Sequence, residues 1–111
     1  MPTGYFYILT NVHNKVLYAG ATTDLYKRVM EHRNKIFTNS FTSRYNVNKL
    51  VYYESFSRAE DAFEREKQIK GGSRKKKVDL VNKVNPEWRD LIENFKKGEL
   101  NELIRIKKYF R

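Results

Sequence analysis

Five side chains within the first 66 residues could act together on one phosphodiester bond. Two are tyrosines in short aromatic stretches, two lie one helical turn apart, and the last is a single carboxylate: Tyr7, Tyr18, Arg28, His32 and Glu66. Phenol and imidazole groups can orient or deprotonate water, a guanidinium can neutralise phosphate charge, and a carboxylate can hold a hard cation. This set of side chains suits hydrolysis of a nucleic-acid backbone.

The predicted strands place the two tyrosines on one hairpin. Residues 5–9 are aromatic and β-branched, which is typical of a strand, and residues 16–19 form a second strand after an asparagine-containing turn at 11–15. Residues 50–54 predict a third strand, and the polar segment 37–48 before it predicts a loop. With the helices described next, the sequence predicts a small α+β fold.

Capping signals predict two helices that carry the remaining three side chains. Asp24 is a suitable N-cap for a helix that runs to about Lys35 and contains the arginine and the histidine. Ser57 and Glu60 have the spacing of a capping box, so a second helix, which contains the glutamate, should start there. The glycines that begin at Gly71 end it.

The rest of the chain predicts a helical region. Ser73 can cap a short basic helix that runs to about residue 82, and Asn85-Pro86 indicates the start of another helix. That helix and a last amphipathic one would carry apolar faces formed by Trp88, Leu91, Ile92 and Phe95, and then by Leu100, Leu103, Ile104 and Phe110. We therefore expect one domain over residues 1–84 and a helical extension over residues 85–111 that packs on it.

Two charged residues fall where their helices should be apolar. Arg28 lies close to the apolar stripe of the first helix, and Glu66 takes an apolar position on the second. A partly buried charge costs free energy unless it is paired or used. One interpretation is an internal Arg28–Glu66 ion pair, and the other is that both side chains point into a shared cleft. Likewise, a lone histidine or a strand tyrosine is more often a packing residue than a catalyst.

Charge points to a polyanionic partner. The net charge is +10 on 111 residues, which favours binding of DNA or RNA through counter-ion release. We assign the nucleic-acid surface to Lys27 and to an acid-free run of six basic residues: Lys67, Lys70, Arg74, Lys75, Lys76 and Lys77. The alternative interpretation of such a run is a solvated helix face.

Composition also excludes several classes of protein. Cysteine is absent, which rules out disulfides, thiolate metal sites and thiol catalysis. There is no second histidine at ligand spacing for a transition-metal site, whereas Mg²⁺ held by one carboxylate, water and phosphate is compatible with the residues. No apolar run has the length of a membrane span, so we expect a cytoplasmic protein that does not contact membranes.

Several segments together resemble the GIY-YIG endonuclease superfamily, specifically its small single-domain bacterial branch, which is similar to the N-terminal domain of excinuclease C. Tyr5-Phe6-Tyr7 and Tyr18-Ala19-Gly20 stand at the two signature triplets. Residues 21–28 resemble the continuation into the catalytic arginine, and residues 63–71 resemble the segment with the metal-binding glutamate. Asn85-Pro86-Glu87-Trp88 resembles the ending that is typical of small members.

The resemblance covers roughly residues 4 to 92 and has three departures. Tyrosine replaces glycine in the first triplet, and alanine replaces isoleucine in the second. Ala21 stands where some relatives carry a lysine.

The resemblance implies a three-stranded antiparallel sheet flanked by helices, and an enzyme that cuts one DNA strand with a single Mg²⁺ or Mn²⁺ ion. In this pattern Tyr18 is the general base, Tyr7 orients the water, and Arg28 stabilises charge on the phosphate. His32 assists positioning or proton transfer, and Glu66 holds the metal. Because a tyrosine pKa is about 10, forming phenolate at neutral pH would cost about 4 kcal/mol, which nearby positive charge must offset.

Such an enzyme would serve DNA repair, recombination or related DNA processing, with a protein partner as one way of choosing its target. The main alternative is a nucleic-acid-binding module on the same fold whose catalysis is weak or lost. A third is an interaction protein that docks a partner through Trp88 and the C-terminal helices. The oligomeric state is not predicted.

Overall fold

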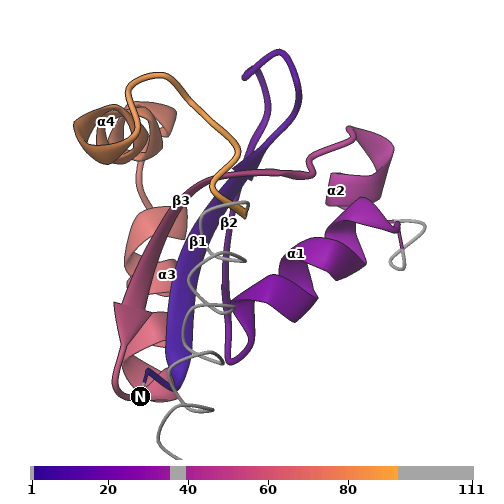
Figure 1. Ribbon diagram of the computed structural model, residues 1–111. Coiled ribbons are helices and arrows are strands. Elements are labelled where there is room, and N and C mark those ends of the chain that lie inside the picture. The colour runs from indigo at the N-terminus through magenta and orange to yellow at the C-terminus, as the bar shows by residue number, and fades with distance from the viewer. Residues whose placement is uncertain (1, 36–39, 93–111) are drawn as a thin grey trace, which may run out of the picture.

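A three-stranded sheet forms the centre of the molecule in the computed structural model, which describes residues 2–35 and 40–92 (Figure 1). The strands are β1 (Gly4–Thr10), β2 (Leu17–Thr22) and β3 (Lys49–Phe56), and their order is β2-β1-β3. Both strand pairs are antiparallel. The predicted α+β class and three-stranded antiparallel sheet are therefore confirmed.

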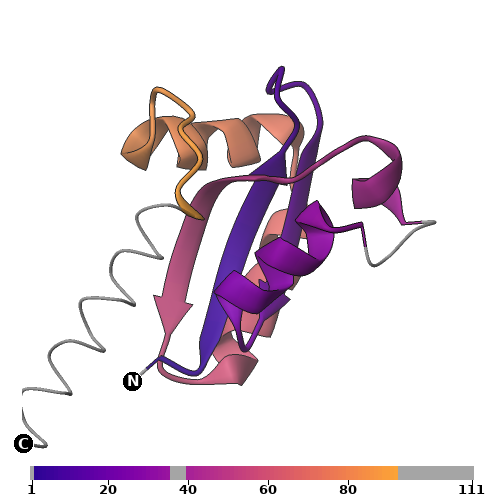
Figure 2. The same cartoon turned by 45° about the vertical axis from the view of Figure 1, so that its right-hand side comes forward.

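Helices cover both faces of the sheet. The helices are α1 (Leu25–Arg33), α2 (Phe41–Arg44), α3 (Ala59–Lys70) and α4 (Arg74–Val84). Figure 2 shows α1 on the near side of the sheet and α3 and α4 on the far side. Within residues 2–35 and 40–92, no helix has both the length and the apolar character that crossing a membrane requires.

Alternation along the central strand creates two separate cores. Tyr7 and Leu9 point to the face covered by α1, where Leu25 and Val29 pack against them. Phe6 and Ile8 point to the opposite face, where the buried residues include Ile69 of α3 and Val81 of α4. Because side chains alternate along a strand, Tyr7 lies on the same face of the sheet as Leu9, and α1 covers that face.

The start of α1 agrees with its predicted N-cap, whereas α3 starts differently from its prediction. The Asp24 carboxylate accepts a hydrogen bond from the Lys27 backbone N–H at 3.1 Å. In contrast, the N-cap of α3 is Arg58, whose side chain makes no capping hydrogen bond, so the predicted capping box at Ser57 is wrong. The Ser57 carbonyl instead accepts a hydrogen bond from the Thr3 hydroxyl at 2.7 Å, which ties it to the end of the sheet.

The predicted loop before β3 contains a short helix. α2 is four residues long, and the Ser40 hydroxyl caps it by accepting a hydrogen bond from the Ser43 backbone N–H at 3.2 Å. A single turn of helix is too short to show an apolar period in sequence, which explains why polarity alone predicted a loop.

The predicted helix start at Asn85-Pro86 is also wrong, because residues 85–91 are not helical. Asn85 is the C-cap of α4, and its buried amide donates hydrogen bonds to the Val51 and Arg89 carbonyls, each at 2.9 Å. Its side-chain oxygen also accepts a hydrogen bond from the Arg89 N–H at 3.1 Å. These contacts turn the chain back toward β3, and the predicted helical positions from Phe95 to Phe110 lie outside the described residues.

The segment 85–92 crosses the edge of β3 and joins the two cores. The Leu91 N–H donates a hydrogen bond to the Leu50 carbonyl at 2.7 Å. Trp88 packs against the core that contains Phe6, whereas Ile92 belongs to the core that contains Tyr7. We call residues 85–92 the edge strap.

Replacing Asn85 by alanine should lower the free energy of unfolding by about 2 to 3 kcal/mol, because it leaves buried backbone groups without their hydrogen-bond partner. Denaturant titration measures this change. Lys83→Ala, at an exposed position on the same helix, is the control and should stay within about 0.5 kcal/mol of the unmodified protein. Equal stability of the two variants would contradict the role given to the Asn85 amide.

Candidate active site

β1 and β2 bring the two tyrosines together on the face covered by α1. The rings of Tyr7 and Tyr18 have centroids 6.4 Å apart. Tyr7 pairs with Gly20 in the strand register, and its ring crosses over that glycine, so that an added Cβ would lie 2.5 Å from Tyr7 Cζ. The glycine of the second triplet therefore makes room for the Tyr7 side chain.

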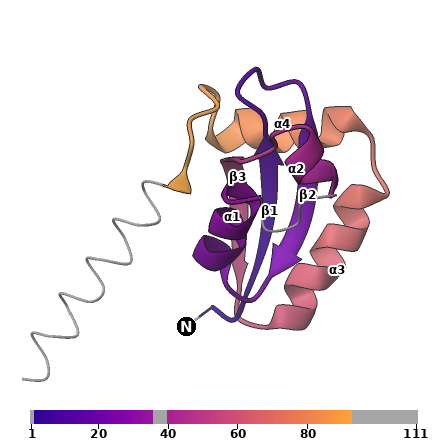
Figure 3. The same cartoon turned by 90° about the vertical axis from the view of Figure 1, so that its right-hand side faces the viewer.

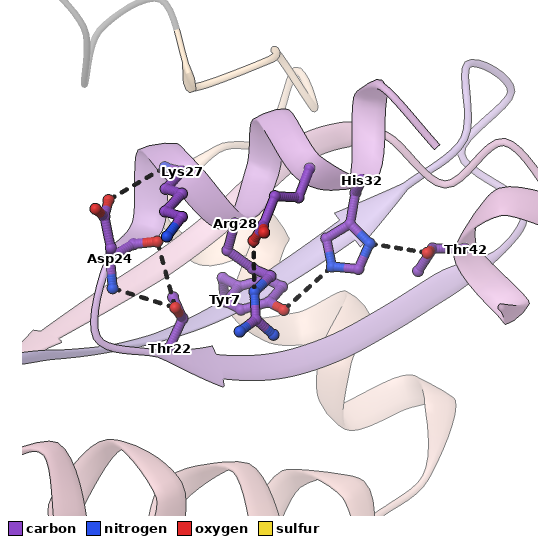
Figure 4. A network of polar contacts seen from close by, with 8 residues as sticks. Tyr7, Thr22, Asp24, Lys27, Arg28, His32 and Thr42 are labelled. Atoms are coloured by element: carbon purple, nitrogen blue, oxygen red, sulfur yellow. Dashed lines mark hydrogen bonds and ion pairs between the residues drawn. The ribbon is translucent and has the colours of Figure 1, made fainter. Parts of the chain in front are cut away.

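α1 places His32 beside both tyrosines, and Figure 4 shows its contacts with Tyr7 and Thr42. His32 Nε2 lies 3.4 Å from the Tyr7 hydroxyl oxygen, and Nδ1 lies 2.8 Å from Thr42 Oγ1. The imidazole also meets the Tyr18 ring edge-on at a centroid distance of 5.6 Å. His32 was predicted from sequence as a site residue, and its imidazole lies between Tyr7, Tyr18 and Thr42.

Burial determines the protonation of the innermost groups. The pKa of His32 is lowered, first by burial and then by the positive charge of Arg28, so its imidazole is neutral at pH 7. The pKa of Tyr7 is raised, mainly by burial and further by Tyr18, although Arg28 opposes this increase. Tyr7 is therefore a neutral phenol at physiological pH.

Arg28 lies between the buried pair and solvent. Its side chain is 40% exposed, and its Nε lies 3.2 Å from a carboxylate oxygen of Glu31. Its charge acts on both Tyr7 and His32. A guanidinium in this position can donate hydrogen bonds to an anion without any movement of α1.

A pocket of about 390 Å³ opens beside these groups, which is large enough for a nucleotide-sized ligand. Three of the predicted residues line it together with three residues at the start of α2: Tyr18, Arg28, His32, Ser40, Phe41 and Thr42. The sequence interpretation missed the α2 residues because it treated residues 37–48 as a loop. The serine before Phe41 was the available signal, since serine is a preferred N-cap.

α3 contributes Glu66 and Lys70 at the edge of β2, along which it lies in Figure 3. The Lys70 ammonium lies 5.2 Å from the centroid of the Tyr18 ring and 3.6 Å from a carboxylate oxygen of Glu66. The negative charge of Glu66 also contributes to raising the pKa of Tyr7. Arg28 and Glu66, for which an internal ion pair was one interpretation, each pair with a charged residue on their own helix.

The donor atoms fit a hard cation better than a transition metal. Within residues 2–35 and 40–92, no group of three histidine, aspartate or glutamate side chains could hold a metal ion. Glu66 is the carboxylate that the sequence assigns to a metal ion, and its negative charge acts on Tyr7. Mg²⁺ commonly uses one or two carboxylates and completes its shell with water and phosphate oxygens, so this donor set is compatible with it.

The predicted nucleic-acid residues divide into separate groups. Lys27 is exposed on α1, and Lys67 is exposed on α3. Lys70, on the same helix, reaches Tyr18 as described above. The remaining four, Arg74, Lys75, Lys76 and Lys77, follow one another at the start of α4, where the Arg74 guanidinium donates a long hydrogen bond of 3.5 Å to the Asn14 carbonyl in the β1–β2 turn.

Comparisons with known proteins agree with this geometry. A family model described as the GIY-YIG catalytic domain matches residues 3–79. Among similar proteins, a UPF0213 protein of Syntrophus aciditrophicus is 37% identical over 78% of this chain and 98% of its own length. A UPF0213 protein of Bacillus pumilus is 34% identical over 84% of this chain and 93% of its own length. No solved structure matches the chain significantly.

Proposed function

Since the chain belongs to the GIY-YIG family of nuclease catalytic domains, we propose that it is a divalent-metal-dependent endonuclease that hydrolyses a DNA phosphodiester bond. The observation that carries this proposal is the gathering of four predicted residues around one pocket or directly behind it: Tyr7, Tyr18, Arg28 and His32. Glu66 approaches the same place from α3. Hydrolysis of this kind would serve DNA repair, recombination or related DNA processing.

The two tyrosines take different roles in this reaction. Tyr18 lines the pocket and acts as general base on the attacking water. Tyr7 is only 1% exposed, and burial raises its pKa, so it orients the water as a neutral phenol. To act as a base, Tyr18 gives its own proton to solvent and takes one from the attacking water, and forming phenolate from a free tyrosine at neutral pH costs about 4 kcal/mol, which adds to the barrier of the reaction.

Arg28, His32 and Glu66 have separate roles around the phosphate. Arg28 donates hydrogen bonds to the non-bridging oxygens, whose negative charge increases as water attacks. His32 holds Tyr7 in place from behind. Glu66 would hold one Mg²⁺ or Mn²⁺ ion, whose charge neutralises the departing 3′-oxygen.

The test incubates the purified protein with single-stranded, duplex, nicked and branched DNA, with and without Mg²⁺ or Mn²⁺. We expect cleavage of at least one substrate in the presence of metal and no cleavage in EDTA. Glu66→Gln should bind DNA but not cut it, whereas Glu64→Gln, at an exposed position on the same helix, should cut normally. DNA binding without cleavage under all conditions would favour the alternative of a binding module whose catalysis is lost.

The basic start of α4 should contribute to DNA binding in a salt-dependent way. Replacing Lys75, Lys76 and Lys77 by glutamine should reduce the slope of log K against log [salt] by about 2, because each phosphate contact contributes about 0.9. This reduction corresponds to about two phosphate contacts rather than three, because the Lys75 ammonium already pairs with an Asp79 carboxylate oxygen at 3.1 Å. Fluorescence anisotropy at several salt concentrations measures it, and an unchanged slope would place the DNA surface elsewhere.

A further inference from the structure

A chain of hydrogen bonds runs from the innermost tyrosine to the start of α2. It passes from the Tyr7 hydroxyl to His32 Nε2 at 3.4 Å and from His32 Nδ1 to Thr42 Oγ1 at 2.8 Å. It continues from Thr42 Oγ1 to Ser40 Oγ at 3.1 Å. Tyr7, His32 and Thr42 are all buried, and the last two also line the pocket.

Chemistry gives this chain a direction at the Tyr7 end. Tyr7 is a neutral phenol, and Arg28, with which it forms a side-chain hydrogen bond, can only donate to its oxygen. The Tyr7 proton therefore needs an acceptor, and His32 Nε2 is in position to accept it. Because His32 is neutral, a lone pair on Nε2 requires the ring proton to be on Nδ1.

The same direction is satisfied at the α2 end. An Nδ1–H donor makes Thr42 Oγ1 the acceptor, so the Thr42 hydroxyl can donate its own proton to Ser40. Ser40 Oγ has two lone pairs and also accepts the Ser43 backbone N–H that it caps. Each donor from Tyr7 to Thr42 then has one acceptor, and α2 provides the fixed end of the chain.

We propose that Thr42 is a positioning residue that holds His32 as its Nδ1–H tautomer, so that Nε2 accepts the Tyr7 proton and the Tyr7 oxygen keeps a lone pair for a donor in the site. The consequence for the reaction rests on the proposed function. With its proton directed to His32, Tyr7 accepts a hydrogen bond from the attacking water and orients it toward Tyr18. The opposite tautomer would donate to Tyr7 and turn the Tyr7 proton toward the water.

Nuclear magnetic resonance of isotope-labelled histidine tests the tautomer in the DNA-free protein. The chain has two histidines, so His13→Gln leaves the signals of His32 alone. We expect a protonated Nδ1 and an unprotonated Nε2, and we expect Thr42→Ser to keep this pattern. Thr42→Val, which removes the hydroxyl at nearly constant volume, should shift the population toward Nε2–H. An Nε2–H tautomer in the unmodified protein, or an unchanged pattern in Thr42→Val, would overturn the proposal.

Cleavage kinetics test the consequence for the reaction. Thr42→Val should lower kcat about tenfold, the size expected for one hydrogen bond, with little change in KM, and Thr42→Ser should recover the rate. Ser43→Ala keeps the backbone N–H that Ser40 accepts and serves as the matched control, with thermal unfolding as a check on folding. A shifted tautomer with an unchanged kcat would show that the positioning of His32 by Thr42 does not affect the reaction. If the unmodified protein cuts no DNA, the proposed function fails, while the spectra still decide the tautomer.

Discussion

Arg28→Ala should lower the rate of DNA cleavage by about 10² to 10³, while the affinity for DNA changes only a few-fold. Loss of one pre-positioned donor to a developing oxyanion typically has an effect of about this size. The fold should survive, because the Arg28–Glu31 ion pair is half-exposed and such pairs contribute about 0 to 1 kcal/mol. Single-turnover cleavage and equilibrium binding of one labelled DNA separate the two effects.

Two further variants sharpen this experiment. Arg28→Lys retains the charge but loses the planar donor geometry, so it should recover part of the rate. Lys27→Ala removes an exposed positive charge from the adjacent position of α1 and should leave the cleavage rate of bound DNA unchanged. If Arg28→Ala and Lys27→Ala lose activity equally, general electrostatics rather than a specific phosphate contact would explain the result.

Gly20→Ala should impair both stability and cleavage. The added Cβ would lie 2.5 Å from Tyr7 Cζ, in a fully packed core, so the Tyr7 ring has to move. Overpacking of this kind lowers the free energy of unfolding by about 1 to 3 kcal/mol. Displacement of a positioning group by about 1 Å can reduce a rate about 100-fold, and we expect a loss of that order in kcat.

Gly71→Ala is the matched control for this substitution. Gly71 caps α3 in an ordinary helical conformation, and an added Cβ would meet its nearest neighbour at 3.5 Å. The control should therefore be neutral or slightly stabilising. Denaturant unfolding and cleavage assays on both variants check the prediction. A Gly20→Ala protein as stable and active as Gly71→Ala would show that Tyr7 does not require this space.

The sheet and the two-sided packing of its central strand were predictable from sequence. Alternation places Tyr7 and Leu9 on one face and Phe6 and Ile8 on the other. The register of the strand is well determined, because a slip by one residue would move each side chain to the opposite core. Local signals also determined α1, because Asp24 caps it in the structure as expected. Where local and tertiary preferences agree, sequence is sufficient.

The wrong predictions arose where a contact that is distant in sequence decides which structure a local pattern adopts. Asn85 followed by proline has the composition of a helix start, yet its amide is used to bind the Val51 carbonyl of β3 and it ends a helix instead. Ser57 has the right spacing for a capping box, but its carbonyl is bonded to Thr3. No local pattern carries that information, because the partner in each case is more than 30 residues away in sequence.

Sequence predicted several residues of the candidate site but did not predict all the residues that lie there. Sequence identified Arg28 and Glu66 as charges out of place on apolar helix faces, but it placed Lys70 in a general basic run, whereas the structure brings its ammonium to Tyr18. It also missed Thr42, whose significance depends on the fold placing α2 against His32. A threonine in a polar segment has no distinguishing period or charge.

The edge strap has a consequence for the solubility of the protein. A strand at the edge of a sheet offers unpaired backbone groups that can recruit the same strand from another copy. The edge strap occupies part of that edge by pairing with both backbone groups of Leu50. The Leu91 N–H donates to the Leu50 carbonyl, and the Leu50 N–H donates to the Asp90 carboxylate. A fragment that ends at residue 84 would retain every strand of the sheet but expose this edge. Self-association through β3, rather than simple loss of a terminal segment, is therefore the expected result of shortening the chain there.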